Sequence, residues 1–245
     1  VTIDYNLYSP TMPGSGWMTL SHADHITRTC AKYKHLIPAE KYSPRSAPIT
    51  ASVVSALVAE KPPTAEEYDK TRHTNFRSVL GACSHIANFT LPEICFAVSF
   101  ASQFMANPSE AALVMVLNIL LYLLGAADKV ITFTRQRVAT PGSPITVACD
   151  ADLANSHSNK RSRTGMCAYL YGNLVYACSR LQPSVSLSTA EAEYMAIAAA
   201  GRFGAWYKML VGDIGIVCSY REPAIILSDN VSAIRIAQNP ITHKP

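Results

Sequence analysis

The chain has 245 residues, of which 49% are hydrophobic and 16% are charged. This composition is typical of one large or two small globular domains and is too apolar for a disordered chain. The net charge of +4 is spread thinly, with 12 Lys and Arg against 10 Asp and Glu in residues 1–140 and 9 against 7 in residues 141–245. So weak a basic balance does not by itself establish a nucleic-acid-binding protein.

Residues 1–140 are predicted to be mainly helical. Residues 2–8 and 16–20 alternate weakly and favour a hairpin around Pro13-Gly14-Ser15-Gly16. The pattern then predicts a helix at 22–35, capped by Ser21, and Pro-rich extended connections at 37–49 and 60–65. Further helices are expected at 65–88, 92–106 and 109–125, followed by a short strand at Val130–Thr134.

One apolar run raises the question of a membrane. Residues 111–127 contain Asn118 as their single strongly polar side chain. A bilayer span takes about 20 apolar residues, with about 17 as the lower limit. The run lies at that limit and lacks an aromatic belt or a basic cluster at one end, so it favours a buried helix over membrane attachment.

The pattern changes after residues 139–144, Ala-Thr-Pro-Gly-Ser-Pro, where a linker and domain boundary are predicted. Strands are expected at 145–149, 166–171 and 174–178, the last two joined by a turn at Gly172-Asn173. An Ala-rich helix at 189–211, a strand at 224–227 and a helix from 230 follow. This order predicts a compact α/β unit.

The seven cysteines are scattered, and none forms a CxxC pair. Several lie in apolar runs, as Cys95 does, which favours buried free thiols over zinc ligands or disulfides. The N-terminal residues also lack a signal-peptide pattern. Both features predict an intracellular protein, cytoplasmic or nuclear.

Three acidic residues of the second half lie at positions that suit a site. Asp150 and Asp229 each follow an apolar strand, and Glu193 lies early in the helix between those strands. Because sites of α/β sheets gather at strand ends beside helix termini, these carboxylates are expected to converge.

Each carboxylate also has a purely structural interpretation. Asp150 can be a loop residue beside an Asx-turn at Asp152, and Asp229 can cap the following helix. Glu193 suits a solvated helix face. Glu191, by contrast, matches a capping box with Ser188 and is assigned to that role, with its carboxylate expected to bind the Ser188 amide.

Several short sequence words of the chain are distinctive. They are Ser-Leu-Ser-Thr-Ala-Glu-Ala-Glu-Tyr-Met-Ala (186–196), Cys-Asp-Ala-Asp-Leu-Ala-Asn (149–155), Lys-Arg-Ser-Arg-Thr-Gly (160–165), Ser-Arg-Leu-Gln (179–182), Ser-Asp-Asn-Val-Ser-Ala-Ile (228–234) and, upstream, Phe-Arg-Ser-Val-Leu-Gly (76–81). Together these words resemble the copia-type Pol polyproteins of LTR retrotransposons. The run at 186–196 is the most specific, and the resemblance is strong from residue 76 onward.

The resemblance implies an α/β fold with a ribonuclease H-like mixed sheet and helices over 145–245. It implies a mainly helical reverse-transcriptase thumb- or connection-like region over 1–140. The implied activity is two-metal hydrolysis of the RNA strand of an RNA–DNA hybrid, with two Mg²⁺ ions about 3.5–4 Å apart. Asp150 would bridge both ions, and Glu193 and Asp229 would each complete one.

The resemblance also implies partners, namely the hybrid and the remainder of a Pol polyprotein. Lys160, Arg161, Arg163 and Arg180 would bind nucleic-acid phosphates, although a solvated basic loop explains the first three equally well.

The chain departs from the family in three respects. It contains no Asp-Asp dipeptide, so no polymerase activity is expected. The family's fourth acidic ligand would follow Asn239-Pro240-Ile241-Thr242-His243, but the sequence stops at Pro245, so this ligand and its helix are expected to be missing from a ribonuclease H-like domain truncated at its C-terminus. Leu91 stands where the family has Arg, and residues 111–124 lack its usual basic residues and Trp. A weak or lost nuclease is therefore expected, with a non-catalytic nucleic-acid- or protein-binding module of the same fold as the alternative.

Overall fold

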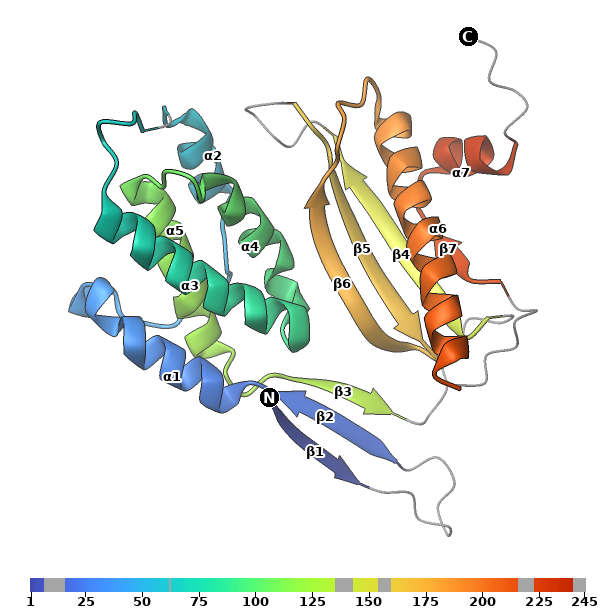
Figure 1. Ribbon diagram of the computed structural model, residues 1–245, viewed down its shortest axis with the longest axis horizontal. Helices are drawn as coiled ribbons and strands as arrows, with labels where there is room; N and C mark the ends of the chain where they lie inside the picture. Colours follow the sequence, from blue (N-terminus) through green and yellow to red (C-terminus); the bar gives the residue numbers. More distant parts are fainter. Residues whose placement is uncertain (7–15, 62, 135–142, 154–159, 216–222, 240–245) are drawn as a thin grey trace. The chain divides into compact units, whose positions relative to one another are not determined.

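The protein is a mixed α/β chain with two β-sheets (Figure 1). Its computed structural model describes residues 1–6, 16–61, 63–134, 143–153, 160–215 and 223–239. The chain divides into two compact units, one comprising 1–6 and 18–132 and the other 7–17 and 133–245. Positions 139–142 of the predicted linker lie outside the described residues.

The described residues of the first unit form five α-helices. They are α1 (Ala23–Tyr33), α2 (Ala51–Ala59), α3 (Lys70–Phe89), α4 (Cys95–Ala101) and α5 (Glu110–Gly125). Short 3-10 turns cover Lys34–Leu36, Ala39–Lys41, Pro92–Ile94 and Ser102–Phe104. Helix α2 lies between the two predicted extended connections at 37–49 and 60–65, in a segment for which no element was predicted. Its Leu57 is buried in the core of this unit.

Local capping explains where two of these helices differ from their predicted limits. The predicted helix 65–88 begins only at Lys70, because the Asp69 carboxylate accepts hydrogen bonds from the Thr71 and Arg72 amides. In α1, Ser21 Oγ accepts from the Ala23 amide, whereas His22 occupies the N-cap position. Ser21 therefore binds an amide of the first turn but is not the N-cap residue, and the helix starts one residue later than predicted.

Helix α5 contains most of the apolar run that suggested a membrane span. It has 16 residues, and ten of them are buried. Its core neighbours lie on α1, α3 and α4, as for Ile26, Leu80 and Phe100. No helix among the described residues is long and apolar enough to cross a membrane.

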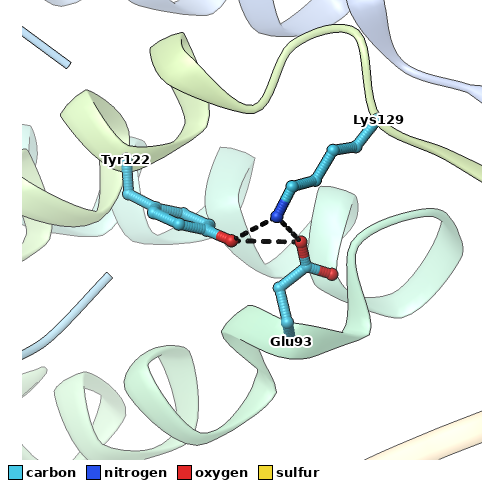
Figure 2. Close-up of polar contacts among 3 residues, drawn as sticks. All are labelled: Glu93, Tyr122 and Lys129. Carbon is cyan, nitrogen blue, oxygen red and sulfur yellow. Dashed lines mark hydrogen bonds and ion pairs between the residues drawn. The ribbon is translucent and has the colours of Figure 1, made fainter. Parts of the chain in front are cut away.

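A small polar cluster lies between α5 and the turn before α4 (Figure 2). Lys129 Nζ lies 3.0 Å from Glu93 Oε1 and donates to the Tyr122 hydroxyl at 2.8 Å, and that hydroxyl donates to Glu93 Oε1 at 3.1 Å. These partners raise the pKa of Lys129. Because the Lys129 and Glu93 side chains are 52% and 37% exposed, solvent screening limits the ion pair to at most about 1 kcal/mol.

Three short strands form a sheet of order β1-β2-β3. They are β1 (Thr2–Asn6), β2 (Trp17–Ser21) and β3 (Val130–Thr134). The neighbouring β1 and β2 correspond to the predicted hairpin, whose turn lies outside the described residues. Strand β3 has the predicted limits.

A four-stranded sheet organises the second unit, with the order β6-β5-β4-β7. Its strands are β4 (Ile145–Asp152), β5 (Arg163–Leu170), β6 (Asn173–Leu181) and β7 (Ile225–Leu227). The pairs β4–β5 and β5–β6 are antiparallel, whereas β4–β7 is parallel.

The hairpin turn between β5 and β6 lies one residue earlier than predicted. Its two central residues are Tyr171 and Gly172, whose φ angles of 49° and 77° are both positive, as a primed two-residue turn requires. Asn173 instead pairs with Leu170, and its side-chain amide donates to the Thr134 carbonyl at 3.1 Å.

Helix α6 (Thr189–Asp213) lies along one face of this sheet, followed by the short α7 (Val231–Gln238) (Figure 1). Small residues allow close packing, since Ala192, Ala196 and Ala200 are fully buried at four-residue spacing against the inward side chains of β4 and β5. At Gly204 a Cβ atom would lie 3.1 Å from the Ala224 Cβ. The glycine therefore permits the approach of helix to sheet.

Candidate metal centre

Asp150 lies near the end of the central strand β4. The burial of β4 alternates, with Cys149 and Ala151 in the core against α6 and Asp150 exposed between them. This is the period of two expected of a strand with one covered face. Asp150 is therefore a strand residue in register with Gly165, which removes the interpretation of it as a loop residue.

Asp229 is brought beside Asp150 by the parallel pairing of β4 with β7. In that register Ala148 of β4 is opposite Leu227 of β7. Asp150 lies two residues after Ala148, and Asp229 lies two residues after Leu227. The capping alternative is wrong for Asp229, because Asn230 Oδ1 caps α7 by accepting from the Ala233 amide at 2.9 Å.

Glu193 approaches the two aspartates from the N-terminal end of α6. Ser188 Oγ caps that helix by accepting from the Glu191 amide at 3.1 Å, and Glu191 Oε2 accepts from the Leu187 amide at 2.7 Å. The predicted capping box is thus present, except that Glu191 binds the Leu187 amide and not that of Ser188. Because these contacts make α6 begin at Thr189, Glu193 lies one turn inside the helix.

The Glu193 side chain is buried, with an exposed fraction of 4%, which excludes the solvated helix face. The Ala151 amide donates a hydrogen bond to its carboxyl group. Its Oε2 atom is buried and has no hydrogen-bond partner. A buried oxygen left in this state costs about 1–3 kcal/mol, so it requires an explanation.

The three carboxylates converge on one point. One ligand oxygen from each of Asp150, Glu193 and Asp229 lies within 4.8 Å of the others. Burial, followed by the nearby charge of Asp150, raises the pKa of Glu193 to about 7 from an ordinary value of 4.5. Burial, followed by the charges of the same carboxylates, raises the pKa of the Cys149 thiol to about 11.

This donor set fits a hard divalent cation. The ligands are oxygens of carboxylates, which Mg²⁺ prefers, and the neighbouring Cys149 remains a thiol that donates to the Leu227 carbonyl at 3.5 Å. A bound cation would neutralise the crowded negative charge and give Glu193 Oε2 a partner.

The four basic residues predicted to bind nucleic acid are not gathered on one exposed loop. Lys160 is exposed, and Arg161 is half-buried beside it. Arg163 is only 3% exposed in β5, opposite Asp152, and burial lowers the pKa of its guanidinium. Arg180 is exposed on β6, where its Nη2 donates to the Tyr176 hydroxyl at 2.8 Å. The solvated-loop alternative therefore fails for Arg163.

Gln182 is a positioning residue to which the sequence reasoning assigned no role. It is 3% exposed, and its Nε2 donates to Thr164 Oγ1 at 3.0 Å and to the Ala192 carbonyl at 2.9 Å. These bonds join β5 to the residue that precedes Glu193. Its position in the motif Ser-Arg-Leu-Gln (179–182), which carries part of the family resemblance, was the feature of the sequence that could have indicated a role for Gln182.

Comparison with known proteins agrees with the sequence words. The Retrovirus-related Pol polyprotein from transposon TNT 1-94 of Nicotiana tabacum is 28% identical over 208 residues, which are 83% of this chain and 15% of that protein. The corresponding polyprotein from transposon RE1 of Arabidopsis thaliana is 31% identical over 198 residues, or 80% of this chain and 13% of that protein. The chain belongs to the copia-type Pol polyprotein family.

A shorter relative is also similar. Secreted RxLR effector protein 161 of Plasmopara viticola is 30% identical over 135 residues, which are 55% of this chain and 92% of that protein. No family model matches the chain, and no solved structure does. Since the chain spans less than a sixth of each Pol polyprotein named above, the three carboxylates of this Pol segment must be interpreted from their own geometry.

Proposed function

We propose that the second unit is a ribonuclease H-like domain that hydrolyses the RNA strand of RNA–DNA hybrids within a Pol polyprotein. The observation that carries this proposal is the convergence of Asp150, Glu193 and Asp229 to within 4.8 Å. Hydrolysis of a phosphodiester requires concentrated negative charge to be stabilised, and a carboxylate cluster that holds divalent cations provides for this.

The arrangement of elements supports the same fold. Three antiparallel strands, β4 to β6, precede α6, and the chain then returns to β7, which is parallel to β4. This arrangement of a strand-end aspartate, a helix glutamate and a second strand-end aspartate agrees with the ribonuclease H-like layout that the sequence words imply.

Asp150, Glu193 and Asp229 would hold two Mg²⁺ ions. When bound, these ions supply Lewis-acid activation of water and stabilise charge on the leaving oxygen. The pKa of about 7 means that Glu193 holds a proton for about half of the time at neutral pH. Cation binding is therefore coupled to loss of that proton and strengthens as the pH rises through 7.

Neighbouring residues keep the carboxylates in position. The Ala151 amide and the Gln182 side chain fix the start of α6 relative to β4 and β5. Lys160 and Arg161 lie just before β5, where they would contact phosphates of the hybrid.

Cleavage of an end-labelled RNA–DNA hybrid in Mg²⁺ tests this function. We expect Asp150→Asn to lower the rate by about a hundredfold or more, as loss of one electrostatic group in an active site does. The matched control is Glu191→Gln, which removes one carboxylate from the same helix but preserves a capping side chain. Equal cleavage by the Asp150→Asn variant and the unmodified chain would contradict the proposal.

The same assay separates the non-catalytic alternative. A chain that binds the hybrid in a salt-dependent manner but never cleaves it is a binding module with this fold. In that case the labelled RNA strand would stay intact with the unmodified chain and with both the Asp150→Asn and the Glu191→Gln variants.

A further inference from the structure

We propose that the second unit has a separate binding site for a flat aromatic anion, in the wedge between the edge strand β6 and helix α6. The wedge contains a partly open cavity of about 440 Å³, within the range of small-molecule sites. None of its lining residues belongs to the carboxylate cluster. The site is therefore distinct from the carboxylate cluster, but it shares Gln182 and Arg180 with the positioning and predicted phosphate-binding residues named above.

The cavity exists because one face of α6 carries small side chains. Met195, Ala198, Ala199 and Arg202 line it from the helix and have the three- and four-residue spacing of one helix face. The two alanines do not fill the space between helix and strand. A larger aliphatic residue in their place would do so.

The walls suit an aromatic ring. Met166 on β5 and Met195 on α6 both line the cavity, and methionine thioethers make favourable contacts with aromatic rings. Phe203 also lines it and stacks on Tyr176, with ring centroids 4.7 Å apart and planes inclined by 17°. Phe203 also stacks on Tyr207, with ring centroids 5.6 Å apart, so a flat ligand would pack against this aromatic group.

The charge of the cavity favours an anion. Arg180 and Arg202 both line it and are exposed. Arg180 Nη2 donates to the Tyr176 hydroxyl at 2.8 Å, which holds its guanidinium at the wall. Within the described parts of the chain, neither arginine forms an ion pair with a carboxylate. Two guanidiniums beside an apolar wall are the elements that bind a planar carboxylate, sulfonate or phosphate.

The probe for the test is anilinonaphthalene sulfonate, a flat aromatic anion whose fluorescence reports binding to the full chain. We expect Arg180→Gln and Arg202→Gln each to weaken its affinity about fivefold, as loss of one exposed charge pair does. Arg235→Gln on α7 is the matched control, since it removes one exposed positive charge from the same unit away from the cavity. The neutral analogue phenylnaphthylamine should bind more weakly and respond to none of these changes.

A cavity-filling variant supplies a second measurement. Ala199→Leu should reduce binding of the probe more than tenfold while retaining the helical circular dichroism, because leucine is a good helix former. The proposal is overturned if Ala199→Leu and both arginine variants bind the probe as the unmodified chain does, or if phenylnaphthylamine binds equally tightly.

Displacement then identifies the class of anion. Adenosine monophosphate that displaces the probe, where adenosine does not, makes the site one for a nucleotide. Displacement by naphthalene sulfonate but not by the nucleotide makes it one for an aromatic acid. Failure of both compounds to displace the probe overturns the proposal.

Discussion

Glu193 is the buried carboxylate of the cluster, and burial and nearby charge act on it together. The side chain is buried near Asp150 and Asp229, and its pKa is raised to about 7. An acid with a raised pKa stabilises the fold only while it is protonated. Its contribution is complete below the ordinary value of 4.5 and is lost as the pH rises through 7.

At the residue scale we therefore predict that Glu193→Gln alters the pH dependence of stability. Glutamine lacks the titration, so between pH 4.5 and 7 the unfolding free energy of the unmodified chain should fall relative to the variant, by up to about 3 kcal/mol. Urea unfolding with a chelator present measures the difference. Glu191→Gln should show the pH dependence of the unmodified chain, and parallel curves for Glu193→Gln and the unmodified chain would refute the prediction.

At the scale of elements, the start of α6 determines where Glu193 lies. Ser188 caps the helix, Glu191 binds the Leu187 amide, and Gln182 binds the Ala192 carbonyl. These contacts fix the first turn from both sides. The short β7 then places Asp229 level with Asp150 through its parallel register with β4.

We expect Ser188→Ala to destabilise the second unit by about 1 kcal/mol, because an N-cap hydrogen bond is lost. The free energy of unfolding is measured by chemical denaturation, with a signal that reports the unfolding of α6. Ser184→Ala is the control, since Ser184 is exposed and its hydroxyl donates a weak hydrogen bond to the Met195 sulfur, at 3.6 Å. The effect of this variant on the free energy of unfolding should stay within about 0.5 kcal/mol. Equal effects of the two variants would show that the cap does not stabilise the helix.

At the scale of the whole molecule, the residues that the structure describes form two hydrophobic cores. One includes Phe76, Ile86 and Leu120 on α3 and α5, and the other includes Val147 and Ala168 on β4 and β5. Among the described residues, the carboxylate group at Asp150, Glu193 and Asp229 is the one that could hold a metal ion, and it lies entirely in the second unit.

Mg²⁺ is therefore predicted to stabilise one unit selectively. At a concentration a hundred times the dissociation constant, binding should add about 2.7 kcal/mol to the unfolding free energy. Hydrogen exchange measures this directly. Amides of β4 and α6 that exchange through unfolding of the unit should slow about a hundredfold, whereas those of α3 and α5 should not change. Equal protection of both units, or retained protection in Asp150→Asn, would exclude this site as the cause.

The sequence by itself determined the features that depend on near neighbours. The apolar run before Asp150, the capping box at Ser188 and the alanine spacing of α6 each encode a local structure, so the order of elements after residue 145 could be predicted. The resemblance to copia-type Pol polyproteins came from the same short words. By contrast, the register that places Asp229 level with Asp150 is set by pairing of strands about 80 residues apart.

Only the tertiary structure decided the state of the carboxylates, because burial and charge proximity are properties of packed elements and not of spacing. The low exposure of Glu193 and its raised pKa depend on β4, α6 and β7 together. Burial of Arg163 in β5 likewise overrode the basic-loop pattern around it. The sequence therefore specifies which groups are available, and long-range packing determines which of them converge, which are desolvated and which remain at the surface.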